Sequence, residues 1–278
     1  MKKTVLITGA TGYLGAVVTR DLINSRKYNI NILLEDINDY ESIEAYLSGQ
    51  KVDVVVHMAA LVPSRKNTDK KVLQTNYYAT KNLAALCKEC HFIFLSSECV
   101  FRSDTPLERY INDAKEPETL YGKSKAAAED YLLNQSGINK LSIIRTSMLY
   151  GYDAPKRKNF LRFLFDNVEE SQKVEVFTDV YNRPTHVKDL SNFILTTIEE
   201  SITGTIHAVS EDYVSRYKLS EMFCDAYGYS KDLLIPANQP LAWKKPKQLN
   251  LKPSEIFTRQ IKFPLNVGIK SCLQKLEN

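Results

Sequence analysis

The stretch Thr4-Val5-Leu6-Ile7-Thr8-Gly9-Ala10-Thr11-Gly12-Tyr13-Leu14-Gly15 decides the fold, because it joins an apolar run, a glycine-rich turn and the start of an amphipathic segment. In this order, Gly9 permits a tight turn, Gly12 lets a pyrophosphate approach the backbone, and Gly15 lets a helix pack closely on a strand. The start of that helix would offer free N–H groups and the positive end of its dipole to phosphates. A glycine turn without a ligand is the alternative, but the strand before it and the helix after it favour dinucleotide binding.

Short apolar runs alternate with longer amphipathic segments through the first half of the chain. Strands are expected at residues 4–7, 30–34, 53–57, 92–95 and 141–144, and helices at 15–24, 42–47, 69–88 and 123–133. Val54-Val55-Val56 has no polar alternation, as expected for a strand that is covered on both faces of a parallel sheet. The alternation predicts an α/β protein with a Rossmann-type, doubly wound parallel sheet.

The pattern changes after Gly151, where a basic loop leads into an amphipathic stretch at residues 160–168 and prolines become frequent. We expect residues 1–150, together with 185–210, to form the dinucleotide-binding Rossmann domain. Residues 151–184 and 211–278 are expected to form a smaller C-terminal substrate-binding lobe. Ligands of open α/β sheets bind at the carboxyl ends of the strands, so the predicted site lies between the sheet and the lobe.

The overall composition excludes several classes of protein. Among the 278 residues, 44% are hydrophobic and 25% are charged, which excludes global disorder. No apolar run reaches the ~18 residues of a membrane span, and the apolar stretch at the N-terminus is too short for a signal peptide. We therefore expect a cytoplasmic protein with no membrane partner. The net charge of +4, without a basic block, argues against nucleic-acid binding but allows an anionic small molecule.

The five cysteines do not form the pattern of a disulfide framework. Cys87-Lys88-Glu89-Cys90-His91 matches the attachment pattern of c-type haem, but that attachment needs export and no export signal is visible. The segment closes a predicted helix just before an apolar strand, which favours buried cysteines at a helix end. No second Cys/His pair has metal-ligand spacing, so we expect no metal site.

The residues after the second predicted strand bear on the choice of dinucleotide. Glu35 and Asp36 lie about where an acid would bind the adenosine ribose hydroxyls and favour NAD. The link to the next helix is short, which also allows Asp36 to lie near the adenine ring. No arginine follows Gly12 to clamp a 2′-phosphate, although Arg26 and Lys27 are within reach of that region. NADH and NADPH therefore both remain as the expected cofactor.

A tyrosine–lysine pair supplies the candidate acid–base chemistry. Tyr121 and Lys125 are four residues apart at the start of a predicted helix, so both project from one face. Free tyrosine has a pKa of about 10, and a neighbouring ammonium favours the phenolate and lowers that pKa. Lys125 can also hold a ribose hydroxyl and thereby position a nicotinamide. An exposed helical pair is the alternative, but the hydroxyls of Ser96-Ser97 at the end of the fourth strand, where they could polarise a carbonyl, favour catalysis.

Together these segments resemble the extended short-chain dehydrogenase/reductase family along nearly the whole chain. The resemblance is carried by the glycine loop, His57-Met58-Ala59-Ala60, Asn76, residues 96–101, Pro117, residues 121–125 and residues 145–151. It implies a catalytic set of Ser97, Tyr121 and Lys125, with Asn76 helping to order the lysine and a water. The residues expected to bind the cofactor are Gly9, Thr11, Gly12, Tyr13, Leu14, Gly15, Asp36, Met58, Ala59, Ala60, Asn76, Ser96, Tyr121 and Lys125.

Within that family, the chain is most similar to dTDP-4-dehydrorhamnose reductases. That likeness includes Asn159-Phe160, Arg183-Pro184-Thr185, and Lys245-Pro246 where those enzymes carry Arg-Pro. Residues 183–189 and 267–270 also resemble the regulatory beta subunit of methionine adenosyltransferase. The residues expected to bind the substrate are Ser97, Glu98, Tyr121, Thr146, Lys158, Asn159, Arg183 and Lys245. For the lysines, a solvated basic face is the alternative.

Departures from the family pattern narrow the expected reaction. Glu98-Cys99 stands where sugar-nucleotide dehydratases carry Asp-Glu, so dehydration is disfavoured. Lys245 replaces an arginine and cannot make the planar bidentate clasp of a guanidinium on a phosphate. The resemblance implies an NAD(P)H-dependent reductase acting on the C4 ketone of a nucleotide-linked 6-deoxysugar. A non-catalytic cofactor-binding partner subunit and a sugar-nucleotide 4-epimerase are the alternatives, and a homodimer is left open.

Overall fold

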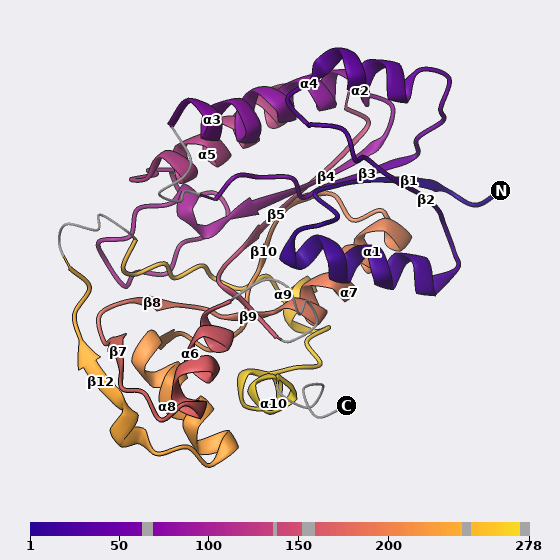
Figure 1. The fold of residues 1–278 in the computed structure, drawn as a ribbon. Coiled ribbons are helices and arrows are strands. Elements are labelled where there is room, and N and C mark those ends of the chain that lie inside the picture. The colour runs from indigo at the N-terminus through magenta and orange to yellow at the C-terminus, as the bar shows by residue number, and fades with distance from the viewer. Residues whose placement is uncertain (63–68, 136–137, 152–158, 241–245, 273–278) are drawn as a thin grey trace. The chain divides into compact units, whose positions relative to one another are not determined.

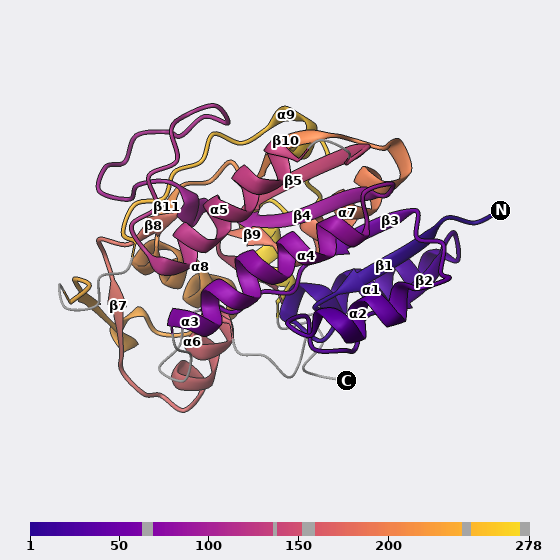
Figure 2. The ribbon, with the colours of Figure 1, turned by 90° about the horizontal axis from the view of Figure 1, so that it is seen from above.

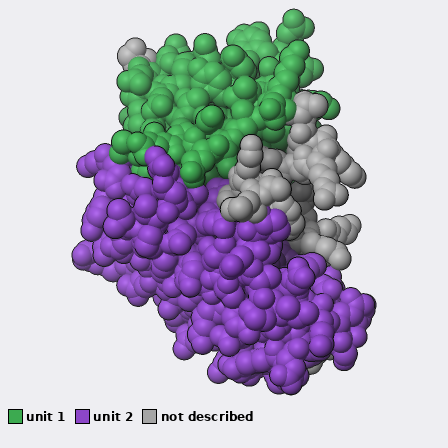
Figure 3. Space-filling view, turned by 90° about the vertical axis from the view of Figure 1, so that its left-hand side faces the viewer, with its two compact units in different colours: residues 1–101, 114–145, 191–206 green, residues 102–113, 146–190, 207–278 purple. Residues whose placement is uncertain are grey.

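The computed structural model describes residues 1–62, 69–135, 138–151, 159–240 and 246–272. Contacts divide the chain into two compact units, which Figure 3 colours separately. The first unit comprises Met1–Phe101, Ala114–Arg145 and Ser191–Ile206, and the second comprises Arg102–Asp113, Thr146–Leu190 and His207–Asn278. Residues 102–113, which the sequence placed with the Rossmann domain, group by their contacts with the second unit.

The first unit is built on a six-stranded sheet with the strand order β10-β5-β4-β3-β1-β2. The strands are β1 (Thr4–Thr8), β2 (Asn29–Ile32), β3 (Val54–His57), β4 (His91–Ser97), β5 (Lys140–Thr146) and β10 (Gly204–Ala208). The pairs β1–β2, β1–β3 and β3–β4 are parallel. Because the chain winds outward from β1 in both directions, the doubly wound Rossmann-type fold expected from the sequence is confirmed.

Helices cover both faces of this sheet. One face carries α1 (Tyr13–Ser25) and α7 (Val187–Glu200), and the other carries α2 (Tyr40–Leu47), α4 (Ala79–Leu86) and α5 (Leu120–Asn134) (Figure 1). Figure 2 looks onto the face that α4 and α5 cover. The central strands are accordingly buried on both sides, whereas the edge strand β2 is partly exposed, and Val54, Val55 and Val56 of β3 are each at most 1% exposed. This double burial explains why their sequence lacks polar alternation.

The long helix expected at residues 69–88 forms as three pieces. It consists of α3 (Asp69–Leu73), a π-helical turn η1 (Gln74–Tyr78) and α4. A π turn inserts an extra residue into the helix, and such turns are frequent at functional sites. Here the turn contains the fully buried Asn76. The apolar periodicity of the sequence does not reveal this insertion, because the residues on both sides of it favour a helix.

The second unit contains short strands and helices around a core of its own. Its helical elements are α6 (Phe160–Glu169), α8 (Arg216–Tyr227), the 3-10 turn η3 (Lys231–Leu233), α9 (Glu255–Thr258) and α10 (Leu265–Ser271). Its strands are β6 (Leu149–Tyr150), β7 (Val174–Phe177), β8 (Tyr181–Asn182), β9 (Thr185–His186), β11 (Val214–Ser215) and β12 (Leu234–Ala237). They pair as β6–β9, β7–β12 and β8–β11. Leu161, Leu164 and Phe223 belong to one buried apolar cluster in this unit.

The described residues include five free cysteines, of which Cys87 and Cys90 are buried at the end of α4. Within the described parts of the chain, no three His, Cys, Asp or Glu side chains gather where they could hold a metal ion. None of the helices described is both long enough and apolar enough to cross a membrane.

Candidate active site

The loop after β1 adopts a conformation that requires glycine at two positions. Gly9 has a φ of +70°, and a Cβ atom there would lie 2.6 Å from the Ala59 backbone nitrogen. A Cβ atom on Gly15 would lie 2.0 Å from the Gly9 carbonyl oxygen. Gly12 is the N-cap of α1, and its N–H donates to the Gly9 carbonyl oxygen across 2.9 Å. The two glycines therefore let the loop, the chain after β3 and the start of α1 approach one another closely.

A pocket of about 260 Å³ lies at this loop, at the carboxyl ends of β1, β2 and β3. Its lining consists of Thr8, Gly9, Ala10, Thr11, Leu33, Leu34, Glu35, Asp36, Ile37 and Ala59. Four residues expected to bind the cofactor, Gly9, Thr11, Asp36 and Ala59, thus meet in one pocket. The backbone at the start of α1 suits a pyrophosphate, and the carboxylates suit ribose hydroxyls, so these residues fit a dinucleotide.

The other residues expected to bind the cofactor lie next to this pocket in the chain. Tyr13 and Leu14 form the first turn of α1, and Met58 and Ala60 flank Ala59 after β3. Their contacts with a cofactor stay a prediction. The pocket acids are both exposed: Asp36 Oδ1 accepts from the Asn38 N–H across 3.0 Å, and Glu35 Oε2 accepts from the Leu34 N–H across 3.1 Å.

Ser97 and Tyr121 meet at the carboxyl end of β4. After Ser97 the chain forms a 3-10 turn, η2 (Glu98–Val100), against which the first turn of α5 packs. A Cβ atom on Gly122 would lie 2.0 Å from the Cys99 carbonyl oxygen, so glycine is required for this approach. The Ser97 side chain accepts the Cys99 N–H across 3.2 Å and lies close enough to the Tyr121 phenol to act on its pKa. The structure thereby brings together the serine and the tyrosine that the sequence singled out.

Tyr121 is a protonated phenol at neutral pH. Burial raises the pKa of Tyr121 above its ordinary value, the nearby Cys99 and Glu98 act in the same direction, and the Ser97 hydroxyl opposes them. Burial, with a contribution from Glu98, likewise raises the pKa of the Cys99 thiol to about 12. The group that faces the site is therefore an O–H that can donate a hydrogen bond or a proton.

Lys125 lies one turn further along α5 and is only 2% exposed. Its Nζ donates to the Leu95 carbonyl oxygen across 2.8 Å and lies 4.5 Å from the centre of the Phe94 ring. Burial lowers the pKa of Lys125 to about 7, although the Glu129 carboxylate acts to raise it. The lysine that the sequence predicts to be catalytic is therefore near its titration midpoint at neutral pH.

Asn76 joins two parts of the site through its side-chain amide. Its Oδ1 accepts the Leu61 N–H across 2.7 Å, and its Nδ2 donates to the Leu61 carbonyl oxygen and to Ser124 Oγ, each across 3.0 Å. Ser124 lies in α5, directly before Lys125. The π turn thus ties the chain after β3 to the helix that carries the catalytic candidates. The expected role of Asn76 in ordering a water stays a prediction.

His57 connects the same region by a directed chain of hydrogen bonds. The Thr80 hydroxyl donates to the Asn76 carbonyl oxygen across 2.9 Å, so it accepts from Nε2–H of His57 across 2.8 Å. Nδ1 of His57 then accepts from the Thr8 hydroxyl across 2.7 Å, and Thr8 Oγ1 accepts the Ala59 N–H across 3.2 Å. This chain requires a neutral ring. It links the end of β1, the pocket wall at Ala59 and the π turn.

Sequence reasoning singled out neither Glu129 nor a role for Gly122 and His57. The signal for Glu129 was an acid four residues after Lys125, on the same face of α5. Ser96, expected to bind the cofactor, donates its hydroxyl to Glu129 Oε1 across 2.5 Å, and its contact with a cofactor stays a prediction. The partners of Glu129 come from β4 and β5, which no local pattern could reveal.

The substrate residues expected in the second unit make contacts within that unit. Thr146 Oγ1 donates to the Ala208 carbonyl oxygen across 3.0 Å. Asn159 is the N-cap of α6 and accepts the Arg162 N–H across 2.9 Å. Both side chains therefore have structural roles, and substrate binding by either stays a prediction.

Arg183 joins three segments of the second unit. Its Nε donates to Asn250 Oδ1 and its Nη2 to Glu108 Oε1, each across 2.8 Å, and its Nη1 donates to the Glu211 carbonyl oxygen. A substrate phosphate would have to compete with these partners, so binding by Arg183 also stays a prediction. The two remaining expected residues, Lys158 and Lys245, lie outside the described residues.

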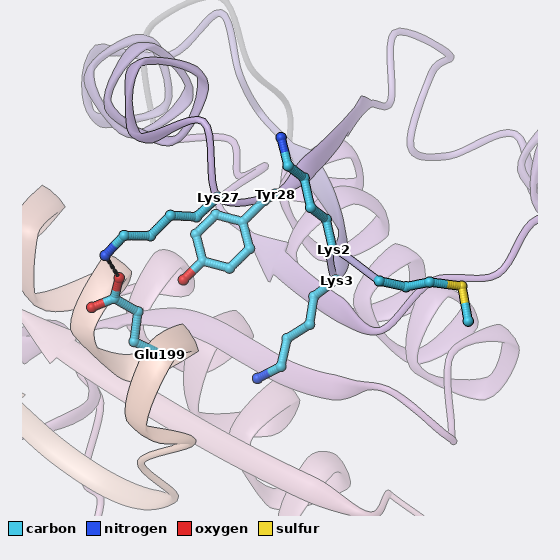
Figure 4. Close-up of a pocket in the computed structure, with 6 residues that line it drawn as sticks. Lys2, Lys3, Lys27, Tyr28 and Glu199 are labelled. Carbon is cyan, nitrogen blue, oxygen red and sulfur yellow. Dashed lines mark hydrogen bonds and ion pairs between the residues drawn. The ribbon is translucent and has the colours of Figure 1, made fainter.

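A second hollow, of about 610 Å³, lies at the opposite end of β1 (Figure 4). Its lining consists of Met1, Lys2, Lys3, Lys27, Tyr28 and Glu199. Lys27 forms an ion pair with Glu199 there. Lys3 precedes β1, whereas the glycine loop follows it, so this hollow is at the amino ends of the strands. Open α/β sheets bind ligands at the carboxyl ends, so we do not assign the cofactor to it.

Comparisons with known proteins agree with this geometry. Methionine adenosyltransferase 2 subunit beta of Rattus norvegicus is 28% identical over 298 residues, which cover 98% of this chain and 87% of that protein. A probable low-salt glycan biosynthesis reductase of Haloferax volcanii is 26% identical over 250 residues, covering 82% of this chain and 81% of that protein. The same fold occurs in dTDP-4-dehydrorhamnose reductase from Bacillus anthracis in complex with NADP, with a TM-score of 0.87, 23% identity and 100% of both chains covered.

The family itself follows from a match along nearly the full chain. The model of the RmlD substrate binding domain matches residues 1–277. Both resemblances expected from the sequence, to dTDP-4-dehydrorhamnose reductases and to the methionine adenosyltransferase beta subunit, are thereby confirmed. The chain belongs to the RmlD substrate binding domain family, within the extended short-chain dehydrogenase/reductases.

Proposed function

We propose that the chain is an NAD(P)H-dependent reductase of a nucleotide-linked 4-keto-6-deoxysugar. The observation that carries the proposal is the proximity of Ser97 to Tyr121, one helical turn from the buried Lys125. The pair is at the carboxyl end of β4, and the pocket that fits a dinucleotide is at the same ends of the neighbouring parallel strands β1 and β3. A reductase needs this combination of a proton donor and a cofactor site on one edge of the sheet.

The side chains divide the reaction between them. The bound nicotinamide supplies a hydride to the ketone carbon. Ser97 hydrogen-bonds to the ketone oxygen, and Tyr121 gives its phenolic proton to that oxygen as negative charge develops, so that the ketone becomes an alcohol. Lys125 holds a ribose hydroxyl and stabilises the phenolate that Tyr121 leaves behind. Positioning of the two reactants supplies much of the remaining acceleration.

The charge of the cofactor pocket supports NADH as the preferred cofactor. The described lining contains the carboxylates Glu35 and Asp36 and neither lysine nor arginine. A 2′-phosphate would meet like charge there, whereas ribose hydroxyls can donate to a carboxylate. We expect NADH to bind about tenfold more tightly than NADPH, which corresponds to 1.4 kcal/mol. The double variant Glu35→Gln, Asp36→Asn should bring the affinities for NADH and NADPH closer together, as measured by fluorescence titration. Tighter binding of NADPH by the wild-type protein would contradict the assignment.

The second compact unit is proposed to be the substrate-binding lobe. We propose Ser97, Glu98 and Tyr121 for the sugar, with Thr146, Asn159 and Arg183 from the second unit contributing to the sugar nucleotide. Lys158 and Lys245 are proposed for the diphosphate on charge alone.

The test is oxidation of NADH and NADPH by the purified protein with dTDP-4-dehydro-6-deoxyhexose as the substrate. We expect loss of absorbance at the nicotinamide band and an alcohol product by NMR. Interconversion of sugars without net cofactor consumption would instead indicate a 4-epimerase. Cofactor binding without any turnover across a panel of keto sugars would overturn the reductase proposal.

A second candidate function is that of a cofactor-binding partner subunit. It is favoured by the 28% identity with methionine adenosyltransferase 2 subunit beta over 98% of this chain. The two candidates differ in a measurable way. A partner subunit would bind the cofactor but would change the activity of a co-purifying enzyme rather than consume the cofactor itself.

A further inference from the structure

Three successive residues of β4 bind three residues on one face of α5. The α5 residues are spaced by four, which places them on consecutive turns of the helix. The contacts are Ser97 to Tyr121, Leu95 to Lys125, and Ser96 to Glu129. The register between strand and helix therefore sets where the catalytic serine, tyrosine and lysine lie. Glu129 makes the third of these contacts between β4 and α5 and has no part in the proposed reaction.

The Glu129 carboxylate is fully buried and is held on both oxygens. Oε1 accepts from the Ser96 hydroxyl across 2.5 Å and from Arg145 Nε across 3.0 Å. Oε2 accepts from Arg145 Nη2 across 2.8 Å and lies 3.4 Å from Lys115 Nζ. The Arg145 guanidinium also lies 4.9 Å from the centre of the Phe101 ring. The carboxylate is thus fixed by β4 and β5 at once.

A buried ion pair of this kind is weak evidence for a role in stability. Taking two charges out of water costs about as much as their attraction returns, and apolar side chains of similar size often do as well. The pair must therefore be explained by what it does for its neighbours. The nearest candidate is Lys125, one helical turn before Glu129 on α5 and itself almost fully buried.

We propose that Glu129, held by Arg145 and Ser96, is a positioning residue that keeps α5 in register on β4 and favours the charged form of Lys125. The proposal deepens the proposed reductase function, because it explains what favours the charged form of the lysine in that site. Arg145 keeps the carboxylate ionised, since Arg145, Ser96 and Lys115 lower the pKa of Glu129 although burial acts to raise it.

The groups that face Lys125 from the packed elements leave Glu129 as the one described acid acting on it. From β4 it meets the Leu95 carbonyl oxygen and the Phe94 ring, and from β3 the neutral His57. The π turn contributes the neutral Asn76 through Ser124. Burial lowers the pKa of Lys125 to about 7, and Glu129 is the group that opposes it. Removing the Glu129 carboxylate should therefore let burial lower the pKa of Lys125 further.

The experiment is a titration of Lys125 by ¹³C NMR in protein labelled at the lysine ε-carbon, with Lys125→Arg to assign the signal. In Glu129→Gln, which keeps the size of the side chain, the Lys125 midpoint should move to lower pH by about one unit, a tenfold change in its protonation. The control is Asp130→Asn, the next residue on α5, whose side chain is 60% exposed and pairs with Lys115. It removes the same charge from the same turn and should leave the midpoint unchanged.

Two further variants separate the electrostatic role from a structural one. Glu129→Asp retains the carboxylate and should restore the midpoint toward the wild-type value. If Glu129→Gln does not fold, Glu129→Gln with Arg145→Gln removes both buried charges and should still lower the midpoint, by less. A folded variant without the carboxylate whose Lys125 midpoint equals that of the wild type would overturn the proposal.

The outcome is independent of turnover. The titration uses no substrate, so a protein that reduces no ketone can still confirm the role of Glu129. Conversely, an active reductase whose Lys125 ignores Glu129 would refute this inference and leave the proposed function standing. In an active enzyme, the high-pH limb of the kcat profile should follow the Lys125 midpoint downward in Glu129→Gln.

Discussion

The proposed reaction depends on the Tyr121 hydroxyl as its proton donor. Tyr121→Phe removes one oxygen and keeps the aromatic ring. We expect nicotinamide cofactor binding to be retained and turnover to fall by roughly 10²- to 10⁴-fold, the usual contribution of a general acid. Fluorescence titration and single-turnover kinetics measure the two quantities separately. Wild-type turnover in Tyr121→Phe would exclude Tyr121 as the proton donor.

The buried His57 ring makes the stability of the protein depend on pH in the acid range. Burial and the Lys125 charge lower the pKa of His57 from 6.5 to about 3 in the folded protein. Below pH 6.5 the unfolded chain binds a proton at His57 that the folded protein does not bind until about pH 3. The free energy of unfolding therefore falls as the pH falls through this window, by about 2 kcal/mol at pH 5.

The measurement is the slope of the unfolding free energy against pH between 5 and 6.5, by urea denaturation. His57→Gln should reduce that slope by about 1 kcal/mol per pH unit, whatever it does to the absolute stability. His91→Gln is the matched comparison, because burial also lowers the pKa of His91, to about 4. If the unfolding free energy of His57→Gln has the same slope against pH as that of the wild type, then the His57 ring of the wild-type protein is already protonated in the folded state.

At the scale of elements, the contact between α5 and η2 depends on a single missing side chain. A Cβ atom at Gly122 would lie 2.0 Å from the Cys99 carbonyl oxygen, so Gly122→Ala must shift the start of α5. We expect a loss of about 1–3 kcal/mol in stability and a fall of about 100-fold in turnover, because Tyr121 would move relative to Ser97. Lys123→Ala, at the exposed next position, serves as the control. Unchanged turnover in folded Gly122→Ala would show that this contact does not position the tyrosine.

The elements also show where local patterns suffice. Apolar runs predicted five strands of the sheet within a few residues, because central strands such as β1, β3 and β4 are buried on both faces and their composition reflects that burial. Local patterns do not predict that the helix at 69–88 divides into α3, η1 and α4. The π turn is stabilised by the buried hydrogen bonds of Asn76 with Leu61 and Ser124, which lie far from it in the sequence.

At the scale of the whole molecule, the two compact units allow the two ligands to be traced separately. The pocket proposed for the dinucleotide is lined by residues of the first unit alone. We expect NADH by itself to slow amide hydrogen exchange in residues 8–15, 33–37 and 57–61 of that unit. At 100 times its Kd, the cofactor should add about 2.7 kcal/mol to the free energy of unfolding.

A sugar nucleotide should protect residues of the second unit, if that unit is the substrate-binding lobe. Hydrogen exchange with dTDP alone and with the keto sugar measures this protection, and the NADH-bound protein provides the baseline. Protection confined to the first unit would contradict the proposed division of labour.

Patterns of neighbouring residues in the sequence determine the fold class and the candidate site of this protein. The glycine loop, the apolar strands and the Tyr121–Lys125 spacing are each patterns of a few neighbouring residues, so the sequence alone predicts the fold and indicates the candidate cofactor loop and the candidate catalytic pair. Tertiary structure decided the rest: the clasp of Arg145 on Glu129, the approach that needs Gly122, and the internal partners of Arg183. These depend on segments 16 to 75 residues apart meeting in a buried setting, where the loss of water makes each charge and each methyl group decisive.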